Sequence, residues 1–209
     1  MYLHSTPKFV KKYFQNLVWE KEVDSNKIFL TFDDGPIPGL TEYVLDELKI
    51  INAKATFFCV GDNVRKHPEI FHKVVSDGHT YGNHTFNHLN GLKTDTDDYL
   101  KNVRKCDKAI SKAGYSRLRK LFRPPYGLMK PSQAKELLKS YEIVMWDVLS
   151  GDFDKNLNPD KCLAKCIQNT KAGSIIVFHD NYKAERTLKH VLPRYLNHFS
   201  EKGFTFEAL

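Results

Sequence analysis

Apolar runs alternate with segments of helical periodicity along most of this chain of 209 residues. Short continuous apolar runs are typical of strands buried on both faces, and apolar residues three and four apart indicate amphipathic helices. The pattern predicts strands over 27–32, 54–60, 79–83, 119–123, 141–146, 174–178 and 204–208. It predicts helices over 40–51, 66–77, 96–113, 131–140, 159–171 and 184–201. This alternation favours a parallel sheet covered by helices, either an open doubly wound sheet or a barrel of fewer than eight strands.

The residues before the first strand form a separate pattern. Thr6 and Pro7 are a helix-start signal, with Thr at the N-cap and Pro at the first helical position. Apolar residues then follow at helical spacing, namely Phe9, Val10, Tyr13, Phe14 and Leu17. We expect residues 1–26 to form an extension whose short helix covers one end of the main domain. With no repeat or low-complexity linker, residues 27–209 are expected to form one domain.

Composition and charge narrow the possible partners. The 32 Lys and Arg residues against 25 Asp and Glu give a formal charge of +7, which suits an anionic polymer or surface. No basic run with interleaved aromatic residues points to nucleic acid. Residues 1–15 lack the apolar core of a signal peptide, and no apolar run is long enough to span a membrane. The sequence alone therefore predicts a cytoplasmic monomer, while a trimmed leader or another export route stays open.

The cysteines offer little chemistry. None of the four forms a Cys-x-x-Cys pair. Cys162 and Cys166 are four apart on a predicted helix, but no second pair of Cys or His lies nearby to complete a metal site. We expect free, buried thiols at all four positions, which include Cys59 and Cys106.

The first polar cluster follows the first predicted strand. Asp33 and Asp34 stand directly after its apolar run and before Gly35-Pro36, which ends the strand. One interpretation is a capping turn, because Asp-Gly is common in turns. The other is a division of labour, in which one carboxylate binds a metal and the other handles protons.

Two histidines supply further ligands for such a metal. His84 and His88 are four apart, so on a helical turn they share one face and can chelate one ion, although surface histidines with this spacing also arise by chance. Together with Asp34 they provide three protein ligands, the number that a catalytic zinc-type site uses. The residue beside the first histidine is Thr85, which is no base. Asp33 is therefore the expected general base.

Three more polar segments end predicted strands. Arg123-Pro124-Pro125-Tyr126-Gly127 follows the fourth strand, and its prolines leave the N–H groups of Tyr126 and Gly127 free to face a ligand, unless the segment is only a structural turn. Asp152 lies in the loop after the fifth strand, and His179 ends the sixth. Parallel strands present their carboxyl ends at one edge, where active sites of α/β folds lie. These segments, with Asp33 and His84, therefore predict one site.

Five segments in this order resemble the motifs of the polysaccharide deacetylase family, also called the NodB homology domain or carbohydrate esterase family 4. They read TFDDGP, HTFNH, RPPYG, WDVLSGDF and VFHD. The resemblance covers about residues 27–209 and implies a distorted (β/α)7-type barrel, which chooses the barrel over the open sheet. It implies hydrolysis of N-acetyl groups of amino sugars in a glycan such as peptidoglycan or a chitin-like oligosaccharide. Alternatives are O-deacetylation of xylan or a similar glycan, hydrolysis of small cyclic amides, and a glycan-binding relative without activity.

The resemblance also implies catalytic roles. Asp34, His84 and His88 would hold one divalent ion, expected to be Zn²⁺ with Co²⁺, Ni²⁺ or Mn²⁺ as alternatives. Asp33 would be the base, with Arg123 as its partner. His179 would be the general acid tuned by Asp152, and the Tyr126 N–H would help to hold the oxyanion.

The substrate groove departs from the usual family pattern at three positions. Val177 would help to form the pocket for the acetyl methyl group, where Leu is usual. Phe153 stands where the family often has Trp, and Leu149 where it often has Asp. The resemblance therefore implies a complete catalytic set and leaves the shape of the sugar groove open.

Overall fold

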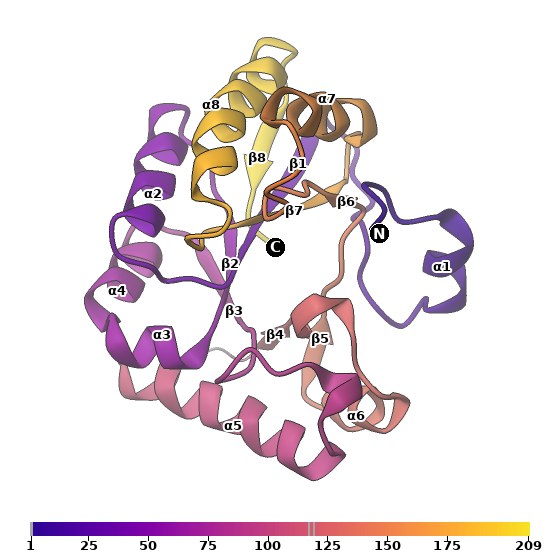
Figure 1. The fold of residues 1–209 in the computed structure, drawn as a ribbon, viewed down its shortest axis with the longest axis vertical. Coiled ribbons are helices and arrows are strands. Elements are labelled where there is room, and N and C mark those ends of the chain that lie inside the picture. Colours follow the sequence, from indigo (N-terminus) through magenta and orange to yellow (C-terminus); the bar gives the residue numbers. More distant parts are fainter. Residues whose placement is uncertain (1, 117, 119) are drawn as a thin grey trace.

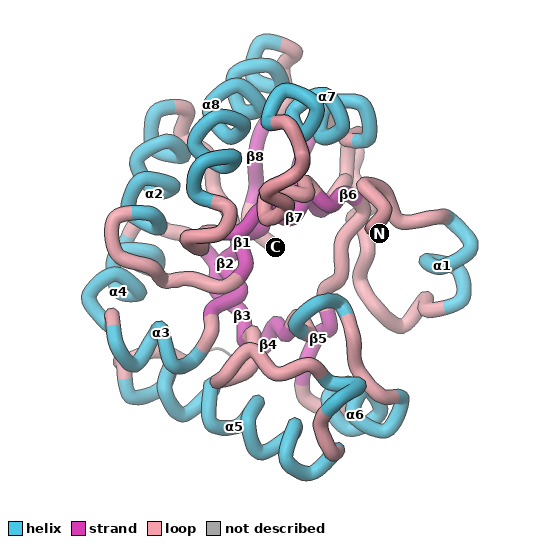
Figure 2. Tube along the Cα trace, viewed as in Figure 1, coloured by secondary structure: helices cyan, strands magenta, loops and turns pink. Residues whose placement is uncertain are grey.

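The structure, a computed structural model, describes residues 2–116, 118 and 120–209. Its strands form one curved sheet with helices packed around the outside (Figures 1 and 2). The strands are β1 (Lys27–Asp33), β2 (Thr56–Cys59), β3 (Thr80–Asn83), β4 (Lys120–Phe122), β5 (Tyr141–Ile143), β6 (Val148–Leu149), β7 (Ile175–His179) and β8 (Thr205–Glu207). The helices are α1 (Lys8–Tyr13), α2 (Leu40–Ile50), α3 (Gly61–Lys66), α4 (Pro68–Ser76), α5 (Thr96–Lys112), α6 (Pro131–Leu137), α7 (Pro159–Asn169) and α8 (Glu185–Glu201). Short 3₁₀ turns cover Gly91–Lys93 and Pro125–Gly127.

The sheet has the strand order β5-β4-β3-β2-β1-β7-β6, and every ladder in it is parallel. β8 pairs with the first residues of β1, where Lys27 lies opposite Thr205. Among the described residues no ladder joins β5 to β6, so the barrel is incomplete on that side. This arrangement confirms the predicted α/β class and the distorted (β/α)7-type barrel.

The N-terminal residues lie along the open side of the barrel. Ser5 forms a bridge with Val148 of β6, and Val18 forms one with Val144 just after β5. Helix α1 itself buries none of its residues and lies outside the barrel (Figure 1). Its Val10 nevertheless packs against the core of the domain, so the helix adds a contact to those of the flanking segments, and that it covers one end of the domain stays a prediction. Thr6 is not the N-cap of this helix: its hydroxyl donates to the carbonyl of Trp146.

Two other elements differ from the sequence pattern. The predicted helix over 66–77 is two helices that meet at His67, whose φ of −131° is not helical. A residue before proline avoids the helical region, and Pro68 then starts α4. The predicted strand over 141–146 ends at Ile143, and β6 lies in a segment expected to be a loop. A strand of two residues, such as β6, is too short to show the alternation of apolar and polar residues in the sequence. Residue 119 of the predicted fourth strand and residue 1 of the extension lie outside the described residues.

Alternation along β1 separates the outer core from the interior of the barrel. Ile28, Leu30 and Phe32 belong to the core between sheet and helices. Phe29 belongs to a second cluster with residues from β2, β4 and β7. Since successive side chains of a strand point to opposite faces, Asp33 points to the same side as Phe29. The strand period therefore directs this carboxylate into the mouth of the barrel.

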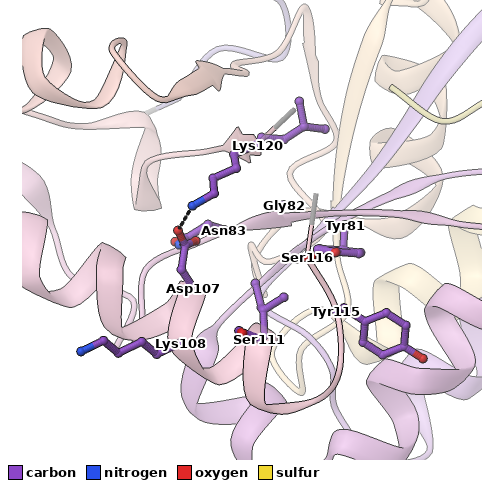
Figure 3. Close-up of a pocket in the computed structure, with 11 residues that line it drawn as sticks. Tyr81, Gly82, Asn83, Asp107, Lys108, Ser111, Tyr115, Ser116 and Lys120 are labelled. Carbon is purple, nitrogen blue, oxygen red and sulfur yellow. Dashed lines mark hydrogen bonds and ion pairs between the residues drawn. The ribbon is translucent and has the colours of Figure 1, made fainter. Parts of the chain in front are cut away.

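A polar cluster fastens α5 to the sheet on its helix-covered side. A cavity of about 260 Å³ lies there. Asn83, Asp107 and Lys120 are among the residues that line it, which Figure 3 draws. The Asp107 carboxylate accepts hydrogen bonds from Asn83 at 2.7 Å and from Lys120 at 2.9 Å. The hydroxyl of Tyr141 donates to it as well, at 2.7 Å. None of the described residues that line this cavity belongs to the five motifs, so we assign it a structural role.

The four cysteines are free and buried, as expected. In the part of the chain that the structure describes, no helix combines the length and the apolar character needed to span a membrane.

Candidate active site

The predicted site residues meet at the carboxyl edge of the sheet. β1 ends at Asp33 and β7 ends at His179, and these two residues lie opposite each other in the β1–β7 ladder. His84 directly follows β3, and Arg123 directly follows β4. Because all four strands are parallel, their ends bring these side chains to one rim. Asp152 lies on the same rim, in the loop after β6.

Asp34, His84 and His88 form a cluster that could hold a metal ion. One ligand atom from each lies within 4.8 Å of the others. Asp34 Oδ1 is 3.0 Å from Nε2 of His88 and 3.5 Å from Nε2 of His84. This oxygen is buried and accepts no hydrogen bond of proper geometry from the described residues. A buried carboxylate oxygen without a donor, facing two imidazole nitrogens, fits a divalent cation.

The protonation of this cluster also suits a cation. Burial lowers the pKa of His84 to about 4, so this imidazole is neutral at pH 7. Its Nδ1 lies 2.8 Å from the carbonyl of Arg123, which directs Nε2 toward Asp34. Burial would raise the pKa of the Asp34 carboxyl, but contact with His88 and the charge on His179 hold it well below its usual range. The residues thus offer one carboxylate and a neutral, oriented imidazole.

The histidine segment is not the helical turn that the spacing suggested. Thr85 and His88 have φ values of 61° and 54°, in the left-handed region. Side chains hold this loop in place: Asn83 accepts from the N–H of Thr85, and Asn102 of α5 accepts from the N–H groups of residues 86 and 87. The two imidazole rings still come together, with centroids 5.0 Å apart. The packing of this loop therefore brings the two imidazole rings together, as the spacing of a helical turn would.

Asp33 is buried in an ion pair with Arg123. Its Oδ1 accepts a hydrogen bond of 2.7 Å from Nη1 of Arg123, and its Oδ2 faces Nε2 of His84 at 3.8 Å. Arg123 is fully buried, and its guanidinium also donates to Thr31, Val144 and Met145. The ring of Phe58 lies 4.2 Å from the guanidinium carbon. So many partners fix the arginine, and the fixed arginine orients the Asp33 carboxylate through a charge-assisted hydrogen bond.

His179 is held by Asp152 on the opposite side of the site. Asp152 accepts from the backbone N–H of His179 and pairs with Nδ1 of its ring, both at 2.8 Å. Burial would lower the pKa of His179, but the charge of Asp152 and this hydrogen bond raise it to about 9. The ring of Phe153 meets the imidazole edge-on at 5.1 Å, and Val177 is buried on the same strand face. Leu149 is buried nearby at the end of β6. Because its pKa is raised to about 9, His179 is protonated at neutral pH.

The Arg-Pro-Pro-Tyr-Gly segment provides one free backbone donor, not two. The N–H of Gly127 donates to the carbonyl of Pro124 at 2.9 Å, so the expectation that it faces a ligand is wrong. The N–H of Tyr126 has no acceptor among the described residues, and this residue has a φ of 62°. Its ring is exposed and lies 4.7 Å from the ring of His88. Tyr126 therefore has a free backbone donor, and its ring contacts His88 of the candidate metal cluster.

Two residues that were not expected from the sequence support Asp34 and the turn that follows it. Asn181 donates to Asp34 Oδ2 at 2.5 Å, which leaves Oδ1 available to a cation. Asp180 accepts from the N–H of Gly35 at 3.0 Å and from the hydroxyl of Thr41 at 2.5 Å. A Cβ at Gly35 would lie only 2.0 Å from an Asp180 oxygen, so the glycine is required there. Both residues directly follow His179, which was the available signal.

Comparison with known proteins places this arrangement in a family. The polysaccharide deacetylase family profile matches residues 20–146, more than half of the chain. A peptidoglycan-N-acetylglucosamine deacetylase of Bacillus cereus is 37% identical over 155 residues, which are 73% of this chain and 55% of that protein. The chain thus spans only about half of that relative. A chitooligosaccharide deacetylase of Azorhizobium caulinodans is 32% identical over 161 residues, 75% of each chain.

A solved structure agrees over nearly the whole chain. The crystal structure of a peptidoglycan N-acetylglucosamine deacetylase in complex with 4-naphthalen-1-yl-N-oxidanyl-benzamide superposes with a TM-score of 0.87. It is 31% identical and matches 98% of this chain and 95% of its own. The profile match and these relatives, together with the strand-end motifs, show that this chain belongs to the polysaccharide deacetylase family.

Proposed function

We infer that this protein removes the acetyl group from N-acetylated amino sugars in a glycan, with peptidoglycan as the favoured substrate. The observation that carries this proposal is the pairing of two charged dyads across one rim. Asp33 with Arg123 supplies a base on β1, and His179 with Asp152 supplies an acid opposite it on β7. Amide hydrolysis needs both, because water must lose a proton and the departing amine must gain one. The metal-binding cluster lies next to both dyads.

Asp34, His84 and His88 would hold a divalent ion, most suitably Zn²⁺ given two nitrogen ligands and one oxygen ligand. Such an ion supplies Lewis acidity toward the acetyl carbonyl and lowers the pKa of water. Asp33 takes the proton from the attacking water, and the hydrogen bond from Arg123 keeps this carboxylate in place. The Tyr126 N–H donates a hydrogen bond to the oxygen on which negative charge develops.

His179 then acts on the leaving group. An amine departs poorly as an anion, so the nitrogen must be protonated as the carbon–nitrogen bond breaks. The raised pKa of His179, about 9, keeps a proton available at neutral pH. Acetate and a free amino sugar are the products. Val177 and Phe153 line the space around this imidazole, and we propose that they shape the pocket for the acetyl methyl group.

The test is release of acetate from a panel of glycans. The purified protein is incubated with peptidoglycan, chitooligosaccharides and acetylxylan, each with and without a chelator, and acetate is measured. Release from the N-acetylated glycans that a chelator abolishes and added Zn²⁺ restores would support the proposal. Release from acetylxylan alone would instead show an O-acetyl esterase. Glycan binding without acetate release, in protein shown to be loaded with metal, would show a relative that has lost activity.

A further inference from the structure

A second cavity, of about 610 Å³, opens beside the proposed catalytic rim. It lies between the loop that follows β6 and the loop that follows β7. Residues 155–159 form one wall, and residues Tyr182, Lys183 and the first turn of α8 form the other. Its volume is in the range of ordinary ligand pockets, which is about 300–1,000 Å³. The catalytic roles proposed above use none of these residues.

The same two loops carry the acid dyad. Lys155 comes two residues after Phe153, whose ring meets His179. Tyr182 comes directly after Asn181, whose side chain donates to Asp34. A glycan bound with its acetamide at His179 would therefore extend into this cavity along either loop. The cavity is placed to receive a neighbouring group of the same chain of sugars.

The walls of this cavity are positively charged. Lys155, Lys183 and Arg186 are exposed, and no carboxylate of the described residues lies within ion-pair distance of any of them. The only acidic side chain among the described lining residues, Glu185, is paired with Lys189 at 2.7 Å. Cations that lack carboxylate partners are available to an anionic ligand.

Two helix starts reinforce this charge. The 11-residue α7 begins at the cavity with Asn158 as its N-cap, and the 17-residue α8 begins there at Glu185. The N-terminal end of a helix carries partial positive charge, which favours an anion within about one turn. The cations and the helix dipoles therefore both favour an anion in this cavity.

We propose that this cavity is a subsite for the carboxylate of an acidic sugar next to the amino sugar that is deacetylated, as muramic acid provides in peptidoglycan. The inference rests on the proposed function and makes its substrate more specific. A neutral glycan such as chitin or xylan would leave Lys155, Lys183 and Arg186 without a partner. The carboxylate could be the lactyl group of the muramic acid itself or part of a peptide attached to it.

The experiment compares substrates that differ only in this charge. We would measure kcat and KM for acetate release with a chitooligosaccharide, with peptide-free peptidoglycan strands of similar length, and with strands that keep their stem peptides. The variant is K183A/R186A in the full chain. The matched control is K112A/K135A, which removes two exposed cations from α5 and α6.

We expect K183A/R186A to raise KM for the muramic acid substrates by about three- to ten-fold, which is the effect of losing one or two exposed ion pairs. Its kcat on those substrates, and both constants on the neutral chitooligosaccharide, should stay near wild type. The control should change neither. A full effect on peptide-free strands identifies the lactyl carboxylate, and an effect that needs the peptides identifies the peptide carboxylates. Added salt should reduce the wild-type preference, since it screens exposed charges.

Two results would overturn the subsite. Unchanged KM on every substrate would show that the cavity binds no carboxylate, although acetate release by wild type would leave the proposed function standing. Equal losses on neutral and acidic substrates would show a general defect of the site. If wild type releases no acetate at all, the proposed function fails. Calorimetric titration with a muramic acid disaccharide then still decides the subsite, by weaker binding to K183A/R186A or by no difference.

Discussion

Replacing Asp152 by Asn tests whether a fixed carboxylate keeps His179 protonated for catalysis. Asp152 contacts both the ring and the backbone N–H of His179 at 2.8 Å. Its charge and hydrogen bond raise the pKa of the imidazole to about 9, against the effect of burial. Without the carboxylate, burial acts with less opposition, and the pKa should fall to about its ordinary value of 6.5 or below.

The size of the effect follows from the protonated fraction. With a pKa of about 9, nearly all of the imidazole carries its proton at pH 7 and about nine-tenths does at pH 8. With a pKa of 6.5, about a quarter carries it at pH 7 and only about 3% at pH 8. Turnover of an amide substrate should therefore fall about four-fold at pH 7 and about 30-fold at pH 8 in D152N. In wild type the rate should decline only as pH rises through about 9.

The free energy of unfolding should also fall as pH rises through the pKa of His179. The folded-state pKa of His179 is raised, so its contribution to stability is complete below its ordinary pKa of 6.5 and is lost as pH rises through about 9. The shift corresponds to roughly 3 kcal/mol at most. Urea unfolding of D152N should therefore show its largest deficit at pH 6 and a small one at pH 10.

The assay is kcat against pH for two substrates, an N-acetyl oligosaccharide and an activated aryl acetate. The ester leaving group needs no proton, so D152N should lose much less activity on the aryl acetate than on the amide. H179A should show the same contrast more strongly. Metal content, measured by elemental analysis, serves as the control and should not change. Two results would refute the role of His179 as proton donor. One is a decline of the amide rate at the same high pH in D152N as in wild type, and the other is an equal loss of activity on amide and ester.

Three further substitutions test the rest of the rim. D33N should keep its metal and lose about 10²–10⁴-fold in kcat, as expected for a general base; near-normal turnover would assign the base elsewhere. H84A should lose most of its bound Zn²⁺ in equilibrium dialysis while its circular dichroism stays native, because the barrel core does not include the rim; unchanged occupancy would argue for other ligands. G35A should lower the free energy of unfolding by about 1–3 kcal/mol, because the new methyl group meets the buried carboxylate of Asp180. An unchanged urea midpoint in G35A would show that this turn moves aside without cost.

The catalytic groups at strand ends could be found from the sequence because strand period and parallel topology are local rules. Once the apolar runs were identified as parallel strands, Asp33 and His179 had to reach one edge, and the ladder places them side by side. The candidate metal ligands could be recognised from their residue types alone, whether or not the segment was a helical turn. His84 and His88 meet although the segment is an irregular loop. The expectation that these two side chains meet was therefore correct, although the expected local structure was not.

Other features depend on residues far apart in the chain and left no local signal. The guanidinium of Arg123 is held by Thr31 and Asp33 from β1 and by the carbonyls of Val144 and Met145. The family resemblance implied Asp33 as the partner of this arginine, but the sequence did not reveal the other three acceptors or that the arginine would be fully buried. The N-terminal segment forms the expected short helix, α1, but it also forms backbone bridges along the open side of the barrel. Backbone pairing of this kind has no side-chain pattern to reveal it.

The amino-acid sequence by itself determined the class of fold, the family and the set of groups available for chemistry, because these follow from hydrophobic period and from motifs of a few adjacent residues. Only the tertiary structure decided how those groups are supported. It placed Asn181 on Asp34, left a single free N–H at Tyr126, and brought Lys155 of one loop to the same cavity as Lys183 of another. Such contacts depend on the curvature of the sheet and on where loops end in space, which no short stretch of sequence encodes.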